Sequence, residues 1–158
     1  MALKLTSKHW QEICSHGVRD YPNECCGILL GRDDSGDKKV LEVVPLKNLR
    51  HDPVRAQEFL PLDEPGRESE RNRFLIDPLE QLRVEKSARA RSWDVLGYYH
   101  SHPDHPARPS EYDREHAWPW YSYIIVSVEK GEPKDMTCWV LSDDRSRFDP
   151  EQMDVLNT

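Results

Sequence analysis

Residues 98–113 have the sequence Tyr-Tyr-His-Ser-His-Pro-Asp-His-Pro-Ala-Arg-Pro-Ser-Glu-Tyr-Asp. The two histidines at its start, His100 and His102, follow a largely apolar run at residues 93–99 that is typical of a strand. Because side chains alternate between the faces of a strand, both imidazoles are expected on the same face. Two imidazoles on one face suggest a metal site that needs at least one more ligand.

The residues after the histidines predict an irregular loop followed by a helix. The loop contains three prolines, which are expected to end the strand. They are Pro103, Pro106 and Pro109. Ser110 then begins a helical turn that can bring Asp113 back over the strand end. His100, His102 and Asp113 would hold zinc and leave the fourth tetrahedral position open, as in catalytic zinc sites.

Each of these signals also has a plainer interpretation. A His-x-His pair on a strand, taken alone, is more often packing or chance than a metal site. Ser110 and Asp113 also fit a capping box, in which the serine begins the helix and the residue three positions later reaches back. The two roles of the serine are compatible, because a cap that fixes the helix start also positions Asp113.

The motif, taken with an upstream segment, resembles the JAMM or MPN-plus metalloproteases. It begins with His100-x-His102-Pro, has seven residues between His102 and Ser110, and has two more between Ser110 and Asp113. The family also uses a glutamate in a Glu-x-Cys-Gly setting at the start of a strand, and Glu24 stands in such a setting here. The segment is Pro-Asn-Glu-Cys-Cys-Gly-Ile-Leu-Leu-Gly at residues 22–31. The resemblance extends from the N-terminal helix to the strand at residues 121–128.

The resemblance implies an α/β (α+β) fold and a role for each motif residue. It implies one MPN-type domain over residues 1–158, with a curved, mixed, mostly antiparallel sheet flanked by helices around a deaminase-like core. One zinc ion would be held by His100, His102 and Asp113. Glu24 would be the general base and then the general acid, and Ser110 would support the oxyanion. Glu24 can act only if its strand neighbours the strand of the histidines.

The compact prokaryotic branch of this family suggests the substrate. The expected enzyme is a zinc-dependent peptidase or isopeptidase that cuts after the Gly-Gly C-terminus of a ubiquitin-like sulfur-carrier protein. A narrow groove beside a metal admits glycines more readily than bulky side chains. Two alternatives stay open: a metallohydrolase of small peptide or amino-acid conjugates, and a catalytically silent MPN scaffold. The scaffold is disfavoured because every ligand position is filled.

Composition narrows the class of protein further. A chain of 158 residues predicts one domain. Its net charge of −7 argues against nucleic-acid binding, which needs clustered basic residues. No apolar run reaches the length of a membrane span, so a cytoplasmic protein that does not bind membranes is expected. The four cysteines lack CxxC spacing and are expected to be reduced and buried. They are Cys14, Cys25, Cys26 and Cys138.

The remaining elements follow from periodicity and turn residues. A helix is expected after the capping candidates Thr6 and Ser7, with Pro22 ending it. A strand at 25–30 and its return at 40–46 predict a hairpin, and a helix is expected at 79–91 after the cap Asp77. The polar residues 50–73 predict a variable loop that is either a flap over the substrate groove or disordered. The other expectations are a short strand at 74–76, strands at 121–128 and 136–141, a turn at Gly131 and Pro133, and a docked tail at 148–156.

Overall fold

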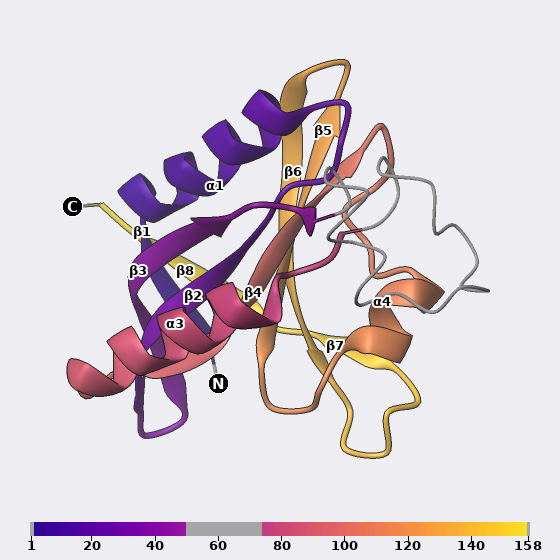
Figure 1. The fold of residues 1–158 in the computed structure, drawn as a ribbon. Coiled ribbons are helices and arrows are strands. Elements are labelled where there is room, and N and C mark those ends of the chain that lie inside the picture. Colours follow the sequence, from indigo (N-terminus) through magenta and orange to yellow (C-terminus); the bar gives the residue numbers. More distant parts are fainter. Residues whose placement is uncertain (1, 50–73, 158) are drawn as a thin grey trace.

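The computed structural model describes residues 2–49 and 74–157, and it builds them into one mixed sheet and three helices (Figure 1). The predicted variable loop at 50–73 lies outside the described residues. The strands are β1 (Ala2–Thr6), β2 (Cys26–Asp34), β3 (Asp37–Leu46), β4 (Asp94–Pro103), β5 (Ser122–Glu129), β6 (Glu132–Leu141), β7 (Phe148–Pro150) and β8 (Gln152–Leu156). The helices are α1 (Ser7–Asp20), α3 (Pro78–Ala90) and α4 (Glu111–His116).

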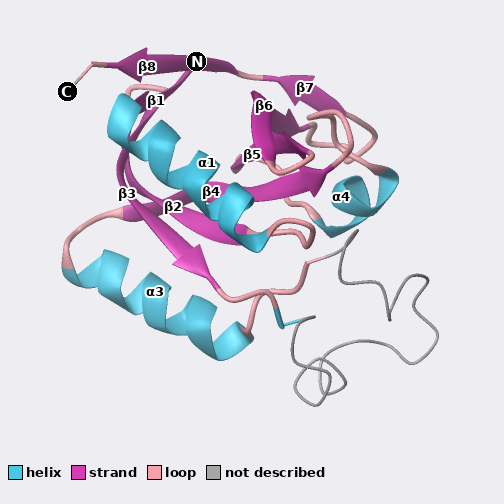
Figure 2. Cartoon of the chain, turned by 90° about the horizontal axis from the view of Figure 1, so that it is seen from above, coloured by secondary structure: helices cyan, strands magenta, loops and turns pink. Residues whose placement is uncertain are grey.

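The sheet curls around helix α1. Its strand order is β7-β6-β5-β4-β2-β3-β1-β8, so β7 and β8 lie at opposite ends although only Glu151 separates them in the chain. The two edges must therefore approach each other, and residues 148–156 run from one edge to the other. Figure 2 shows α1 inside the curve of the sheet and α3 against its outer face. Helix α1 accordingly contacts strands along almost the whole sheet, whereas α3 packs on β4.

The pairing pattern confirms the predicted mixed sheet. The pairs β2·β3, β2·β4, β5·β6 and β6·β7 are antiparallel, and β1·β3, β1·β8 and β4·β5 are parallel. The antiparallel pairs of the described strands outnumber the parallel ones, as expected. Buried side chains form one cluster on the inner face, which includes Tyr99 and Cys25, and another on the outer face, which includes Cys26 and Val84. Cys25 and Cys26, which are neighbours in the chain, thus belong to two different cores.

The helix starts follow the predicted capping chemistry. Thr6 accepts the backbone N–H of His9, and the His9 ring returns a contact to the Thr6 N–H, which completes a capping box at the start of α1. At α3, Asp77 caps the N–H of Leu79 and proline occupies the first turn. Both predicted helix starts are confirmed.

Some sequence-based boundaries are wrong. Residues 2–6 form strand β1, and the predicted tail at 148–156 forms the edge strands β7 and β8. Strand β4 ends at Pro103, so it continues past His102 and the loop begins after the first of the three prolines, as predicted. Pro133 lies within β6 and not in the turn before it. Of the predicted strand at 74–76, the structure shows an isolated bridge between Ile76 and Asn48.

The strand that carries the histidines requires a glycine at its pairing with β5. Gly97 is paired with Ser122, and a Cβ at Gly97 would lie 1.8 Å from the Ser122 carbonyl oxygen. We expect Gly97→Ala to destabilise the protein by about 3 kcal/mol, because the two strands would have to separate. Urea unfolding would measure this loss. Lys86→Ala, on the exposed face of α3, is the control and should stay within about 0.5 kcal/mol of the parent. An equally small effect of Gly97→Ala would contradict the packing described here.

Candidate metal centre

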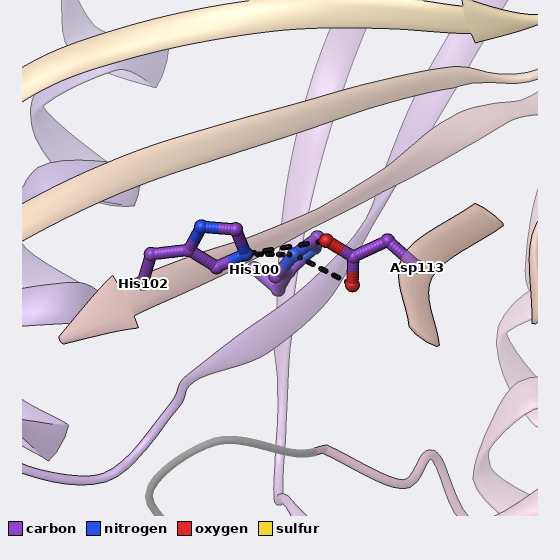
Figure 3. Close-up of side chains that lie close together, drawn as sticks. All are labelled: His100, His102 and Asp113. Carbon is purple, nitrogen blue, oxygen red and sulfur yellow. Dashed lines mark hydrogen bonds and ion pairs between the residues drawn. The ribbon is translucent and has the colours of Figure 1, made fainter. Parts of the chain in front are cut away.

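Three predicted ligands converge at the end of strand β4. His100 and His102 come from β4 and Asp113 from α4, and their side chains meet on the outer face of the sheet (Figure 3). In residues 2–49 and 74–157 this is the one group of at least three His, Cys, Asp or Glu side chains that could hold a metal ion. The alternation predicted for the histidines is what places both rings beside the carboxylate.

The spacing of the donor atoms suits a small tetrahedral ion. The two Nε2 atoms are 3.1 Å apart, Nε2 of His100 is 3.3 Å from Oδ1 of Asp113, and Nε2 of His102 is 3.2 Å from Oδ2. Donors placed about 2.0–2.2 Å from a tetrahedral zinc ion lie about 3.3–3.6 Å from one another. The three side chains can therefore bind such an ion with only small movements. Two imidazoles and one carboxylate are also a donor set that zinc accepts.

The histidine tautomer is set by the loop that follows the strand. Nδ1 of His102 lies 2.9 Å from the carbonyl oxygen of Pro106, so this nitrogen donates its hydrogen. In the neutral ring Nε2 then carries the lone pair, which faces His100 and Asp113. A hydrogen bond of this kind orients metal-binding histidines and strengthens them as ligands.

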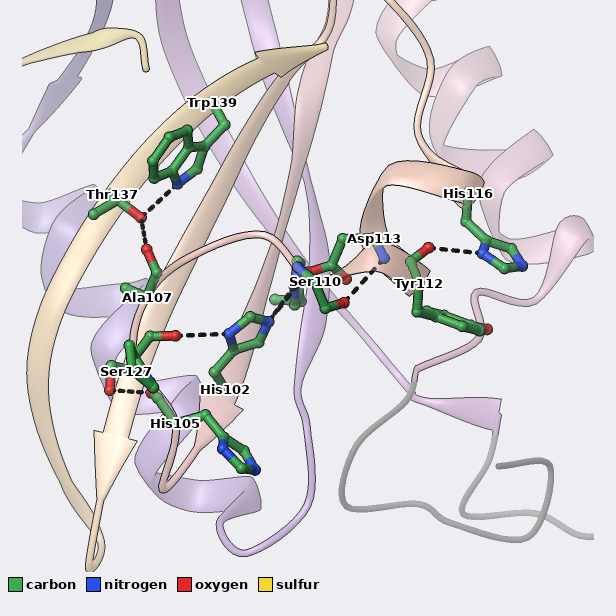
Figure 4. A network of polar contacts seen from close by, with 12 residues as sticks. His102, His105, Ala107, Ser110, Tyr112, Asp113, His116, Ser127, Thr137 and Trp139 are labelled. Carbon is green, nitrogen blue, oxygen red and sulfur yellow. Dashed lines mark hydrogen bonds and ion pairs between the residues drawn. The ribbon is translucent and has the colours of Figure 1, made fainter. Parts of the chain in front are cut away.

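The same loop is held at consecutive carbonyl groups by side chains of three strands (Figure 4). The Pro106 carbonyl is held by His102 of β4, the His105 carbonyl accepts from Ser127 of β5 at 2.6 Å, and the Ala107 carbonyl accepts from Thr137 of β6 at 2.6 Å. These contacts give hydrogen-bond donors to three backbone carbonyl groups that have no regular secondary structure to pair with. They fix the path from His102 to Asp113.

Asp113 is positioned by the predicted capping box. The Ser110 hydroxyl accepts the Asp113 N–H at 3.0 Å, and Oδ2 of Asp113 accepts the Ser110 N–H at 2.9 Å. Burial alone would raise the pKa of Asp113, but its contacts with His100 and His102 outweigh burial and hold that pKa well below its usual range. The group is therefore a carboxylate. Ser110 can still donate its hydroxyl hydrogen while it accepts from Asp113.

Strand pairing brings Glu24 to the same end of the sheet. Strand β2 pairs with β4, and Cys26 lies opposite His100. Just before the strand, Ser101 and Cys25 exchange hydrogen bonds, so the antiparallel approach continues toward Glu24. Glu24 is 5% exposed. The condition set by the sequence, that the strand of Glu24 must neighbour the strand of the histidines, is met.

Two residues near the centre were not singled out from the sequence. Phe74 stacks on His100, with ring centroids 4.8 Å apart. Asn48 is 1% exposed, and its side chain donates to the Glu24 carbonyl at 3.1 Å and accepts the Leu75 N–H at 2.9 Å. It thus links the backbone of Glu24 to the segment that carries Phe74. In the sequence, an asparagine after a strand looks like an ordinary loop residue, so no local signal distinguished it.

If Glu24 is the general base that the resemblance implies, Asn48→Ala should lower kcat about 100-fold while the metal ion stays bound, because small displacements of a catalytic group have costs of that size. The substitution leaves the buried Glu24 carbonyl and Leu75 N–H without this partner. Steady-state kinetics and metal analysis would measure both effects. Asn157→Ala, at an exposed position, is the control. If zinc is lost together with activity, the proposed positioning role of Asn48 is wrong.

The other histidines of the loop and of α4 lie apart from the group. His105 is exposed in the loop, and His116 ends α4 with its ring stacked on Tyr112 at 4.0 Å. The four cysteines are free and buried, as predicted. Burial raises the pKa of Cys25 to about 12 and that of Cys26 well above its usual value, so both are thiols at neutral pH. Thiols bind metal poorly because the ligand form is the thiolate.

A family model described as prokaryotic homologs of the JAB domain matches residues 6–142. That range includes Glu24, Ser110 and the three converging side chains.

No helix in the described part of the chain is both long and apolar enough to cross a membrane.

Comparisons with individual proteins agree with the family model. The chain is 32% identical over 132 residues to a desampylase of Haloferax volcanii, covering 80% of this chain and 81% of the relative. It is 29% identical over 119 residues to a probable TtuB-protein conjugate cleaving protease of Thermus thermophilus, covering 75% and 66%. The crystal structure of AF2198, a JAB1/MPN domain protein from Archaeoglobus fulgidus, matches with a TM-score of 0.54 and 19% identity over 99% of this chain and 100% of the other. This last likeness confirms the predicted fold.

Proposed function

The chain belongs to the family of prokaryotic homologs of the JAB domain, and from this membership we propose that it is a zinc-dependent peptidase or isopeptidase. Its proposed substrate is the amide bond after the Gly-Gly C-terminus of a ubiquitin-like carrier protein. The relatives named as a desampylase and as a TtuB-protein conjugate cleaving protease support this substrate class. The observation that carries the proposal is the convergence of His100, His102 and Asp113 within 4.8 Å of one another.

Zinc is the ion that we propose for this ligand set. His100, His102 and Asp113 would hold it, and their donor atoms leave room for a fourth ligand. When bound, zinc lowers the pKa of a water molecule and polarises a carbonyl group as a Lewis acid. The Pro106 carbonyl keeps the His102 ring oriented for binding.

The other chemistry of amide hydrolysis is assigned to Glu24 and Ser110. The Glu24 carboxylate takes a proton from the attacking water and passes it to the amine that leaves, which a buried carboxylate beside the histidine strand can do. The Ser110 hydroxyl donates to the scissile carbonyl oxygen as that oxygen gains negative charge. Its place at the start of α4 keeps it next to Asp113.

Intact-mass analysis of ubiquitin-like sulfur carriers tests this proposal. Each carrier from the same genome is extended by one residue beyond Gly-Gly and incubated with the zinc-loaded protein or with its Glu24→Ala variant. Loss of the added residue only with the unmodified protein is the expected result. If zinc binds in a 1:1 ratio but no carrier is shortened, the carrier substrate is wrong, and small peptide conjugates become the substrates to test.

A further inference from the structure

We propose that a pocket lined by aromatic side chains beside the metal centre binds one large apolar side chain of the substrate. The pocket has a volume of about 520 Å³, and five Phe, Tyr or Trp side chains line it. We call it the aromatic pocket. Those five side chains are Phe74, Tyr98, Trp118, Tyr121 and Tyr123. The inference rests on the proposed function, because it concerns the specificity of that reaction.

The aromatic pocket is continuous with the candidate metal centre. Phe74 lines the pocket and also stacks on His100. Tyr98 precedes His100 by two residues on β4, so strand alternation puts both side chains on the same face. Two residues of a strand span about 6.6 Å. A substrate chain lying over the metal centre would therefore bring a side chain within about three residues of the cut bond into the pocket.

The lining favours an uncharged occupant. No Asp, Glu, Lys or Arg is among the residues that line the pocket in the described structure. The Tyr98 hydroxyl already accepts from the Gln81 side chain at 3.0 Å, and the Tyr123 hydroxyl accepts the backbone N–H of Trp118 at 2.8 Å. These two hydroxyl groups are engaged with the walls, and besides Gln81 and His116 the lining offers mainly ring and aliphatic surface to a ligand. A charged side chain would lose its hydration there, and the lining contains no Asp, Glu, Lys or Arg to pair with it.

The pocket walls are held in place before any substrate arrives. Tyr98 stacks on Tyr123 with ring centroids 5.8 Å apart, and it meets Tyr121 edge to face at 5.7 Å. Trp118 is 64% exposed, and the Arg145 guanidinium lies over its ring at 5.0 Å. A preformed wall lowers the entropy cost of binding. Ring-lined pockets of this size are suited to aromatic or branched aliphatic groups.

Synthetic peptides provide the test. Each contains Gly-Gly between alanine and serine residues, with one Phe, Asp or Ala at a single position up to three residues before Gly-Gly or after the bond to be cut. Binding is measured by calorimetry with the zinc-loaded Glu24→Gln protein, and cleavage with the unmodified protein. We expect Phe at one position to bind at least about tenfold more tightly than Ala, and Asp more weakly than Ala.

Variants of the exposed pocket wall assign that preference to the pocket. In Trp118→Ala combined with Glu24→Gln, the Phe-to-Ala affinity ratio should fall to about twofold or less, and Trp118→Phe should restore most of it. Trp120→Ala is the control, because Trp120 is 45% exposed in the same loop and does not itself line the pocket, although its ring meets Tyr121 edge to face at 5.4 Å. It should keep the full ratio. Circular dichroism shows whether each variant is folded.

The outcomes separate this inference from the proposed function. Equal binding of the Phe, Asp and Ala peptides at every position, or a preference that survives Trp118→Ala, would overturn the pocket proposal even if carriers are cleaved. A preference that depends on Trp118 supports it even if the unmodified protein cleaves no peptide and no carrier. In that case the pocket stands and the proposed reaction fails.

Discussion

Glu24→Gln is expected to reduce turnover by about 10²- to 10⁴-fold while one zinc ion per chain stays bound, since general acid-base catalysis contributes effects of this size. Glutamine keeps the shape and the polarity of the side chain but cannot carry the proton. Glu24 is not one of the three converging ligands, so metal binding should not depend on it. Initial rates with a carrier substrate and the zinc content of the purified protein would measure the two quantities.

A matched control shows whether the effect belongs to this carboxylate. Glu115→Gln makes the same change at an exposed position on α4, close to the metal centre in sequence but outside the converging group. It should leave turnover within about twofold of the parent, as surface substitutions have small effects. Activity of Glu24→Gln within tenfold of the unmodified protein would remove Glu24 from the proposed mechanism.

His102→Ala is expected to weaken zinc binding by more than about 100-fold and to abolish hydrolysis. Loss of an outer hydrogen-bond partner alone can weaken metal binding by about 10- to 100-fold, and loss of a direct ligand should have a larger effect. The substitution also removes the contact with the Pro106 carbonyl that helps to fix the loop. Competition with a chromophoric chelator would measure the affinity.

His105, which lies in the loop three residues after His102, provides the control for this prediction. His105 is exposed and its side chain lies outside the converging group, so His105→Ala should keep the affinity for zinc. Its backbone carbonyl, which accepts from Ser127, is unchanged by the substitution. Equal losses of zinc in the two variants would show that the loop, and not the His102 ring, determines binding.

Much of the fold follows from local patterns in the sequence. The alternation on β4 predicted both imidazoles on one face, and the caps at Thr6 and Asp77 predicted the starts of two helices. Strands β1, β7 and β8 were missed for a physical reason. Residues 2–6 and 148–156 form short segments that mix polar with apolar residues, and they become strands only because the curled sheet supplies each with a partner strand.

The metal centre could be predicted only in part, because its supports come from distant segments. The resemblance of Glu24, His100, His102, Ser110 and Asp113 to the family motif implied their roles, but spacing alone could not place Glu24 beside the histidines. Nothing local predicted the loop contacts made from β5 and β6.

X-ray absorption at the zinc edge tests the central claim most directly. We predict nitrogen and oxygen donors at about 2.0–2.2 Å, with imidazole scattering and no sulfur at about 2.3 Å. In His102→Ala the spectrum should lose part of its imidazole scattering or show unbound zinc. A sulfur donor, or a spectrum identical in the parent and in His102→Ala, would contradict a zinc ion held by His100, His102 and Asp113.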